Sequence, residues 1–547
     1  MGVGELEDPR DLLVGQRKTW SARGVCRGTY VPRTRNRGVI ASIWLDKRCW
    51  DLGDAMALRR ESHTYSELLL SIDLGDEVAE VDPALAESFV RTADFDEFLS
   101  GRCDLITGIK GSGKSALLLM GAKAPPPRVD ICHAQPSRGP VIYETDVPGQ
   151  LTGDALEDYY LERWVLHTAL TAAYFLLRLG ECSAVHAELV RAGLPTDSQE
   201  SEVAIWVSSG RIMRDVNINN IQFAQSLIRE IDEQLVRNDR SIWVAYDRLD
   251  DVTFAKPQLE QTVLRGLLRA HIYLARVSAR LKSKMFLRSD ILDRATLGAG
   301  LRNLDKVPVL RLNMNAHDMS LLIARRFMRS ERFNEILGEE SHQHDLGEET
   351  LPAVMAHILP KERLNSNNKR RPNFLDVYGA YFYDTTDGSG KFAARNVLAY
   401  LRLAIVQQRR ICEDGRIAHL PHSGPVLSNK ALHAAWVQLS ENRLHSYVYA
   451  EFPSTRNFVE RLEYGPYRYG SIRDLGKRFF GDTDSMRETR TVVDMLKYCG
   501  VLGESGQSFS VGRVYRPALR CRDTPRPSGK QTSGPRSTPA GTRGPND

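Results

Sequence analysis

No stretch of this 547-residue sequence is apolar for long enough to cross a lipid bilayer. The longest apolar stretch, residues 165–177, contains a histidine and has the periodicity of a buried helix. The first thirty residues lack the apolar core of a secretory signal peptide. We therefore expect a cytoplasmic protein that does not use a membrane.

Closely spaced cysteines are missing as well. The eight cysteines lie far apart and form no Cys-x-x-Cys motif: Cys26, Cys49, Cys103, Cys132, Cys182, Cys412, Cys499 and Cys521. This spacing argues against a cysteine-based zinc site and indicates reduced thiols, as in a cytoplasm.

The sequence also lacks a positive charge spread along its length. Its net charge is +5, yet residues 1–60 hold twelve Lys and Arg against seven Asp and Glu, and residues 520–547 hold six against two. The remaining body is slightly acidic and offers no overall cationic field for nucleic acid, although a local patch is compatible with this count. Nucleic acid is therefore a partner that we consider but do not favour.

The sequence does contain a complete phosphate-binding motif. Gly108-Ile-Lys-Gly-Ser-Gly-Lys-Ser115 matches GxxxxGK[ST], with an apolar strand before it and an apolar helical segment after it. The alternative, a glycine-rich turn with a solvated lysine, does not account for these flanking segments. We expect nucleotide contacts from Gly108, Ile109, Lys110, Gly111, Ser112, Gly113, Lys114, Ser115 and Ala116.

Each position of this P-loop has a chemical reason. Gly108, Gly111 and Gly113 let the backbone curl with positive φ, so that successive N–H groups point at phosphate oxygens. A helix that begins near Lys114 adds the positive end of its dipole. The Lys114 ammonium acts on the β- and γ-phosphates as a catalytic group, and the Ser115 hydroxyl is a ligand of Mg²⁺. The motif therefore predicts ATP and Mg²⁺ as cofactors.

A second motif supplies the carboxylate that a P-loop needs for its metal. Ser241-Ile-Trp-Val-Ala-Tyr-Asp247 is an apolar strand ending in aspartate, and we expect Asp247 to hold Mg²⁺. Asp250 or Asp251 could polarise the attacking water as general base, or could instead cap the next helix. Asp247 follows Lys114 by 133 residues, so a mostly helical insertion lies between the two motifs.

A third candidate element is the strand Lys284-Met-Phe-Leu-Arg-Ser-Asp290. In a doubly wound sheet the carboxyl ends of the strands face the ligand. Arg288, Ser289 or Asp290 could therefore sense the γ-phosphate, with Arg288 as the catalytic candidate. The alternative is an ordinary turn from strand to helix with Asp290 as the cap.

Together these motifs resemble a group of bacterial P-loop ATPases labelled FunZ-like, near the STAND and KAP signalling ATPases. The resemblance spans roughly residues 85–465 and includes two less generic stretches, Asp247-Arg-Leu-Asp250 and Phe286-Leu-Arg-Ser-Asp-Ile291. It implies a sheet of the ASCE type, in which one strand separates the P-loop strand from the strand of Asp247. It also implies a helical lid and the use of ATP as a conformational switch.

The sequence departs from this group at one place in the lid. Relatives often carry Pro-Arg-x-Leu there, and that arginine can reach the nucleotide. Here Arg371-Pro-Asn-Phe-Leu375 puts Asn373 at the corresponding position. Arg370 or Arg371 could compensate, which leaves the source of a nucleotide-sensing arginine open.

Near the C-terminus, residues 470–519 predict two helices followed by a short hairpin, the order of a winged helix. Such a module can pack on a nucleotide domain as part of its lid, which we favour, or place a helix in the major groove of DNA. Arg487 and Arg490 would then be the candidate DNA contacts.

These observations predict an α/β fold: a parallel P-loop NTPase sheet of the ASCE type flanked by helices, followed by a helical lid and a C-terminal winged helix. The composition of the first segment also fits a true start near Met56. The expected segments are an Arg-rich, poorly ordered leader (1–65), a P-loop NTPase domain (85–315) with a helical insertion (150–236), a helical lid (316–465), a winged-helix-like module (466–520) and a disordered tail (521–547).

The predicted function is that of an ATPase with slow turnover, which acts as a nucleotide-controlled switch on self-association or on a protein partner. The alternative is a nucleic-acid-dependent ATPase that uses the winged helix and the basic ends. A P-loop kinase or other phosphotransferase is the least favoured, because the sequence shows no recognisable pocket for a small acceptor. ATPase rates with and without DNA or RNA at two salt concentrations would separate the first two.

Overall fold

The computed structural model describes most of the chain between Tyr65 and Arg522. Asp250, Asp251, Arg370, Arg371 and Asn373 lie outside the described residues, as do the expected leader up to residue 64 and the tail from residue 523. The described residues are 65–134, 151–180, 183–196, 202–214, 220–249, 259–296, 307–338, 346, 350–361, 374–414, 424–481 and 486–522.

Five parallel strands form the central sheet in the order β2-β3-β4-β1-β5. Strand β1 pairs with β4, with Leu105 opposite Met285, and with β5, with Leu105 opposite Val309. Because β4 lies between β1 and β3, the sheet has the ASCE order, and the predicted α/β P-loop fold is confirmed. The strands are β1 (Leu105–Gly108), β2 (Val129–His133), β3 (Ser241–Tyr246), β4 (Leu281–Arg288) and β5 (Val309–Arg311).

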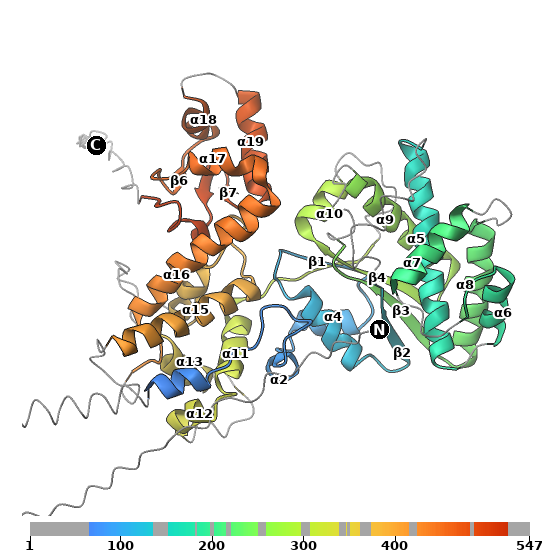
Figure 1. The fold of residues 1–547 in the computed structure, drawn as a ribbon, viewed down its shortest axis with the longest axis horizontal. Coiled ribbons are helices and arrows are strands. Elements are labelled where there is room, and N and C mark those ends of the chain that lie inside the picture. Colours follow the sequence, from blue (N-terminus) through green and yellow to red (C-terminus); the bar gives the residue numbers. More distant parts are fainter. Residues whose placement is uncertain are drawn as a thin grey trace, which may run out of the picture. The chain divides into compact units, whose positions relative to one another are not determined.

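Strands β1 and β3 are buried on both faces, which explains why they are nearly continuous apolar runs. Alternate residues of β3 go to opposite faces: Val244 and Tyr246 pack with α5, α8 and α9, whereas Trp243 and Ala245 pack with α3 and α4. Figure 1 shows the strands between α4 and the helices α5 and α8. These helices are α3 (Ala93–Leu99), α4 (Lys114–Lys123), α5 (Asp154–Arg178), α8 (Asn220–Arg237) and α9 (Glu260–Val277).

The region between β2 and β3 is helical. It contains α5, α6 (Ser183–Arg191), α7 (Glu202–Arg214) and α8. Helix α5 is the longest of the described helices at 25 residues, and its acidic and basic side chains lie in its first ten residues and at Arg178. Among the described residues, no helix combines the length and the apolar character needed to cross a membrane.

A separate helical region follows the sheet. Its core also takes in residues 66–74, which the sequence assigned to no segment, and Leu68, Leu69 and Ile72 are buried in it. Tyr65, which the sequence placed at the end of the poorly ordered leader, is buried there as well, and its hydroxyl donates to the Val426 carbonyl. The helices are α11 (Ala316–Phe327), α12 (Glu331–Leu337), α13 (Thr350–Ile358), α14 (Phe374–Tyr383), α15 (Ala394–Glu413), α16 (Asn429–Arg443), the π-helix η7 (Leu444–Tyr449), the 3₁₀ helix η8 (Pro453–Thr455) and α17 (Arg456–Glu460). Helix α2 (Leu85–Ser88) precedes the sheet, and α10 (Ser289–Thr296) packs with the sheet and α9.

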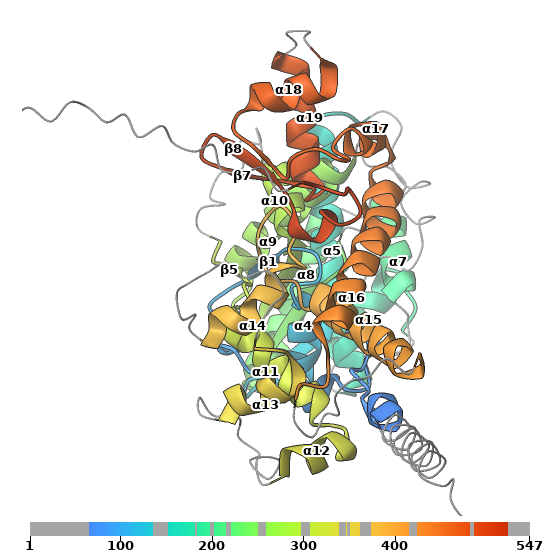
Figure 2. The same ribbon diagram turned by 90° about the vertical axis from the view of Figure 1, so that its left-hand side faces the viewer.

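The last described segment contains two helices and a small antiparallel sheet of order β6-β8-β7 (Figure 2). It packs on the loop after α14, where Gly388 N donates to Gly500 O at 2.6 Å and Val514 N donates to Thr386 O at 2.9 Å. Its elements are β6 (Arg468–Tyr469), α18 (Ile472–Phe480), α19 (Met486–Tyr498), β7 (Leu502–Ser505), β8 (Ser508–Val511) and the 3₁₀ helix η9 (Arg513–Tyr515). We call residues 466–522 the C-terminal module.

Candidate nucleotide-binding site

The P-loop leaves the carboxyl end of β1 and runs into α4, as its sequence predicts. Gly111 and Gly113 have φ of +81° and +94°, and Gly113 is the N-cap of α4, which begins at Lys114. Gly108 differs from the prediction, because its φ is not positive. A Cβ at Gly108 would lie 2.3 Å from the Ser112 hydroxyl oxygen, so glycine is needed there for close approach and not for its φ.

Two side chains of the P-loop face the place where phosphate would bind. The Lys114 ammonium donates to the carbonyl oxygens of Gly108 and Ile109, both at 3.1 Å, and so lies folded over the loop. The Ser112 hydroxyl is buried and has no hydrogen-bond partner among the described residues. A buried polar atom without a partner is costly, and a phosphate oxygen would satisfy it.

Asp247 lies directly after β3 and meets the start of α4. The Ser115 hydroxyl donates to its carboxylate at 2.6 Å. Burial raises the pKa of Asp247, while the Ser115 hydrogen bond and the Lys114 charge oppose that effect. A hydroxyl beside a buried carboxylate fits Mg²⁺, because both groups are hard oxygen ligands and the metal charge would offset the burial.

Arg288, at the end of β4, is directed toward the C-terminal half of the chain. Its strand position is opposite Gly108 of β1, yet its guanidinium donates to both oxygens of Asp290, at 3.2 and 2.8 Å. It also donates to the Tyr447 hydroxyl at 3.3 Å and lies 3.7 Å from a Glu451 oxygen. Asp290 is thus the partner of Arg288, while Ser289 begins α10.

Lys110 of the P-loop joins the same group of residues. Its ammonium donates to the Glu451 carboxylate and lies 4.6 Å from the centre of the Tyr447 ring. The Arg443 guanidinium stacks on that ring at 4.4 Å. We call Lys110, Arg288, Tyr447 and Glu451 the latch, because two of them flank the phosphate site and two belong to the C-terminal half.

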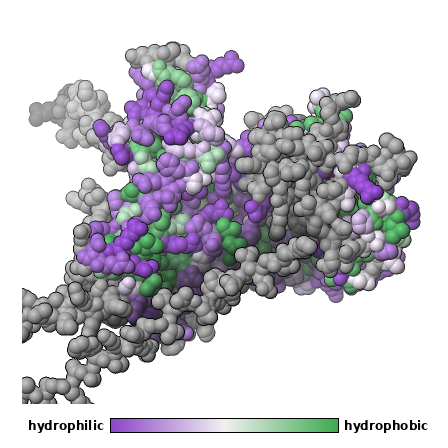
Figure 3. Space-filling model, viewed as in Figure 1, coloured by the Kyte–Doolittle hydropathy of each residue, from purple (hydrophilic) through white to green (hydrophobic). Residues whose placement is uncertain are grey.

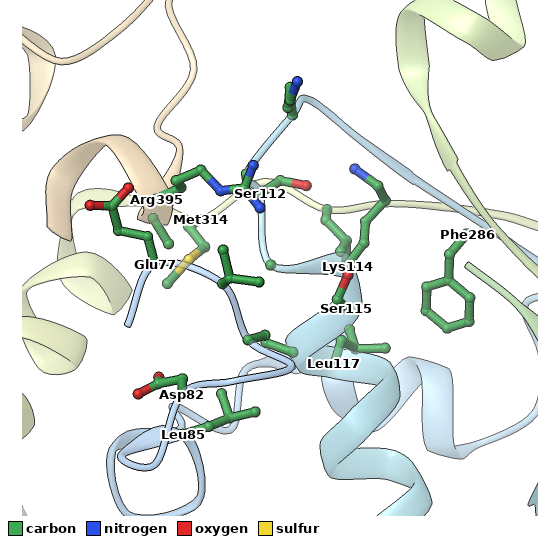
Figure 4. A pocket seen from close by; sticks show the side chains of 18 of the residues that line it. Glu77, Asp82, Leu85, Ser112, Lys114, Ser115, Leu117, Phe286, Met314 and Arg395 are labelled. Carbon is green, nitrogen blue, oxygen red and sulfur yellow. The ribbon is translucent and has the colours of Figure 1, made fainter. Parts of the chain in front are cut away.

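A cavity of about 420 Å³ opens beside the P-loop (Figure 4). Apolar side chains, among them Leu85, Phe286 and Met314, line it together with Lys114 and Ser115. This combination of apolar walls and phosphate-facing groups suits a nucleotide. From the predicted site the cavity takes in Lys110, Gly111, Ser112, Gly113, Lys114, Ser115, Ala116, Asp247 and Arg288.

The sequence did not predict Arg395, which also lines this cavity. It lies in the first turn of α15, and its backbone N–H donates to Gly111 O at 3.4 Å. A Cβ on Gly111 would lie 2.8 Å from that of Arg395, and the buried Arg395 Nε has no hydrogen-bond partner in the described chain. The resemblance in the lid pointed to Arg370 or Arg371 as the nucleotide-sensing arginine. Arg395 was missed because no local sequence pattern marks it.

An acidic loop before α2 forms another unpredicted wall, with Asp76, Glu77 and Glu80 lining the cavity. The loop is tied down by a buried ion pair between Asp82 and Arg326 of α11, and one Asp82 oxygen also accepts from the N–H of Asp76 at 2.9 Å. Burial raises the pKa of Glu77, partly offset by the positive charges of Arg402 and Arg395.

No protein-family model and no curated protein matches the sequence. Among solved structures, the chain is similar to the ORC1 protein of Aeropyrum pernix in complex with DNA, at 11% identity and a TM-score of 0.33, over 81% of this chain and 96% of that one. A Walker-type ATPase of Pyrococcus abyssi matches at 12% identity and a TM-score of 0.37, over 82% and 99%. The ORC2 protein of Aeropyrum pernix, with ADPNP and ADP, matches at 13% and 0.35, over 77% and 88%. At such TM-scores these likenesses carry no argument about function, so the argument rests on the fold of a P-loop NTPase and on its site.

Proposed function

We propose that this chain binds ATP with Mg²⁺ in the cavity beside the P-loop and hydrolyses it with slow turnover. Lys114 acts on the phosphates, and Ser115 and Asp247 hold the metal. The metal, when bound, neutralises charge that develops on the phosphates. Asp250 or Asp251 orients the attacking water as general base. The curled P-loop and the unpartnered Ser112 hydroxyl support this assignment.

We further propose that the nucleotide controls a conformational switch, and the latch is the observation that carries this proposal. Glu451 pairs with Lys110 and lies 3.7 Å from Arg288, the two cations that flank the phosphate site. A bound triphosphate competes with the Glu451 carboxylate for both cations, because charge-assisted bonds to either anion are strong. Nucleotide binding therefore loosens the contact between the P-loop and the C-terminal half.

The backbone around Tyr447 supports a moving part. Tyr447 belongs to the π-helix η7, and π-helical turns are rare and occur frequently at functional sites. Tyr447 is buried, which raises the pKa of its hydroxyl and keeps it neutral. The Tyr447 ring contacts Lys110 of the P-loop and Arg443 of α16. A shift of the P-loop would therefore change the contacts of η7 directly.

The experiment compares Glu451→Gln with the matched control Glu441→Gln, an exposed acid on α16. Hydrogen exchange of residues 444–460 is measured with no nucleotide, with ADP and with the non-hydrolysable ATP analogue. In the wild type and the control, the analogue should accelerate exchange. In Glu451→Gln, exchange should be fast in all three states, and ATP should bind about five-fold more tightly, the equivalent of about 1 kcal/mol for one ion pair.

Two results would contradict the switch. One is that exchange of residues 444–460 in the wild type does not respond to the ATP analogue. The other is that Glu451→Gln binds ATP no better than Glu441→Gln. ATP binding itself is tested separately by Lys114→Ala, so a failed latch leaves the ATPase assignment standing.

The output of the switch is either self-association or contact with a protein partner, in a reducing cytoplasm. The wide spacing of the eight cysteines in the sequence supports that compartment. Sedimentation of the full chain with ADP and with the ATP analogue checks the first output. A change in mass with nucleotide indicates self-association, whereas a constant mass points to a partner.

A nucleic-acid-dependent ATPase is the second candidate. The order β6-α18-α19-β7-β8 supports a winged helix, whose second helix would enter a groove. On α19, however, Arg487 and Arg490 share the exposed surface with Glu488 and Asp494, so its charge is balanced. ATPase rates with and without DNA or RNA, each at low and moderate salt, discriminate the two candidates, since phosphate contacts weaken steeply with salt.

A further inference from the structure

Arginine and tyrosine side chains gather at one end of the C-terminal module. Two distant segments run side by side there, where Tyr464 N donates to Leu519 O and Arg522 N donates to Gly465 O, both at 2.9 Å. This pairing lies at the end of β8 opposite to the β7–β8 turn. We call the side chains it brings together the Arg–Tyr strip: Tyr464, Tyr467, Arg468, Arg516, Arg520 and Arg522.

The strip carries uncompensated positive charge. Residues 464–473 and 505–522 contain six arginines and no Asp or Glu. Some exposed arginines elsewhere in the described chain pair with acids, as Arg237 does with Glu233 and Arg456 with Glu460. Arg468, Arg520 and Arg522 are exposed and form no ion pair with any residue that the structure describes.

Glu463 directly precedes the strip in the sequence, and two further carboxylates near it are engaged elsewhere. Asp474 accepts from the Ser471 N–H at 2.9 Å as part of the capping box of α18. Glu504 is paired with Lys497 of α19. Neither of these two acids neutralises the strip, so Arg468, Arg520 and Arg522 are available to an external polyanion.

The aromatic rings of the strip are stacked and partly exposed. The Arg516 guanidinium lies 4.3 Å from the centre of the Tyr467 ring, and that of Arg520 lies 5.3 Å from the Tyr464 ring. Tyr464 is 47% exposed. Tyr464 and Arg520 also have left-handed φ of +58° and +49°, a strained conformation for side chains of their size. The fold maintains this stacked pair at a cost, as functional surfaces often do.

We propose that the Arg–Tyr strip binds single-stranded nucleic acid, with the arginines on phosphates and the tyrosine rings on unstacked bases. A surface that combines cations with exposed rings suits single strands, whose bases are free to stack on aromatics. In duplexes the bases are stacked on one another and out of reach. This surface is separate from the nucleotide cavity, so the proposal does not depend on ATP hydrolysis.

Two further observations favour a nucleic acid. The strip ends at Arg522, and residues 523–547 add four Lys and Arg against two Asp, so the positive charge continues along the sequence. On the face seen in Figure 3, hydrophilic residues dominate the described C-terminal part, and hydrophobic ones form small separate patches. A partner of this region is therefore recognised by charge and stacking more than by apolar burial.

The test measures binding of a fluorescein-labelled 20-nucleotide oligothymidylate to the full chain by anisotropy, at about 50 and 200 mM salt. The strip variant Arg468→Gln/Arg520→Gln is compared with Arg487→Gln/Arg490→Gln on α19, which removes the same charge. The strip variant should bind about ten-fold more weakly, and its log–log salt slope should fall by about 0.7 for each lost phosphate contact. The α19 variant should stay within two-fold of the wild type.

The ring contribution is tested at Tyr464. Tyr464→Leu should bind the oligonucleotide about five-fold more weakly, whereas Tyr464→Phe, which keeps the ring, should bind like the wild type. ATPase activity should be equal in all these variants, which separates loss of the strip from loss of the nucleotide site. Equal losses in the strip and α19 variants would overturn the proposal. So would tighter binding of a 20-base-pair duplex, or binding of phosphatidylserine vesicles without binding of the oligonucleotide.

Discussion

Three glycines of the P-loop act in two different ways. Gly111 and Gly113 supply the positive φ that turns backbone N–H groups toward phosphate, whereas Gly108 makes room for the Ser112 hydroxyl. Lys114 is held over the loop by two carbonyl oxygens, and the loop has the curl that a phosphate needs. The backbone geometry of the P-loop therefore suits a phosphate group.

Replacing Lys114 by alanine should abolish ATP binding and leave the fold intact, because the ammonium makes no contact in the apolar core. Isothermal titration with ATP and Mg²⁺ measures the binding, and a thermal melt checks the fold. Lys123→Ala, at the exposed end of the same helix, is the control and should bind ATP like the wild type. Wild-type affinity in Lys114→Ala would disprove the P-loop assignment.

Replacing Asp250 or Asp251 by asparagine should separate hydrolysis from binding, since an amide keeps the shape but cannot accept the proton. For the true base, turnover should fall by roughly 10²–10⁴ while ATP affinity stays within a few-fold. Steady-state phosphate release measures turnover. If one variant keeps the wild-type turnover, the aspartate it replaces is not the general base. Wild-type turnover in both variants would show that neither Asp250 nor Asp251 is the base.

The buried ion pair between Asp82 and Arg326 should make stability depend on acid pH. Burial opposes ionisation, yet hydrogen bonds from Arg326, Asp76 and Ala84 and the charge of Arg326 hold the pKa of Asp82 below 3.8. Because the folded pKa is lower than the unfolded one, this stabilisation is complete above the unfolded value and is lost as the pH falls through the folded value.

Asp82→Asn should therefore be about 3–5 kcal/mol less stable than the wild type at pH 7, because it leaves a buried guanidinium without its counter-charge. The difference should shrink as the pH is lowered through the acidic range. Urea unfolding at several pH values gives the two curves. Asp96→Asn, on the exposed face of α3, should differ from the wild type by less than about 0.5 kcal/mol throughout. Parallel curves for Asp82→Asn and the wild type would contradict this reading.

Local sequence patterns predicted one part of the site and missed another. The P-loop and Asp247 each belong to a short sequence motif. Such a motif can be recognised from one strand and the turn that follows it. Arg395, Tyr447 and Glu451 reach the same place from helices more than 280 residues after the P-loop. Nothing in their local pattern distinguishes them from other surface residues of amphipathic helices, since only the tertiary packing brings them to the cavity.

At the scale of elements, α5 and α9 pack most closely at one glycine. A Cβ at Gly266 of α9 would lie 2.5 Å from the Cβ of Tyr160 and 2.9 Å from its backbone carbon. Both helices also cover the face of the sheet formed by Val244 and Tyr246. The strands were predictable because each is a short apolar run, whereas this close approach depends on two helices about a hundred residues apart.

Gly266→Ala should lower the free energy of unfolding, although alanine normally stabilises a helix by roughly 0.5–1 kcal/mol relative to glycine. The added methyl meets backbone atoms of α5, which cannot rotate away, and overpacking of this kind typically costs about 1–3 kcal/mol. Urea unfolding is the measurement. Ala275→Gly, on the exposed side of α9, is the propensity control and should cost about 0.5–1 kcal/mol. A more stable Gly266→Ala would show that the two helices can separate without penalty.

At the scale of the whole chain, two halves meet around the nucleotide cavity. The sheet contributes the P-loop, Asp247 and Arg288, and the later helices contribute Arg395 and Glu451. The C-terminal module is in turn bonded to the loop after α14, through the Gly388–Gly500 hydrogen bond. A change of charge at the phosphates can therefore reach the Arg–Tyr strip through packed elements.

The pairing of β1 also determines when this site can exist. Strand β1 has hydrogen-bonded neighbours only in β4 and β5 among the described strands, and these begin at residues 281 and 309. On the ribosome, the P-loop sequence therefore emerges long before the strands that support it. Strand β1 therefore stays unpaired until most of the NTPase domain has been synthesised. A nascent chain that ends before β4 carries the whole phosphate motif and still lacks both strands with which β1 pairs.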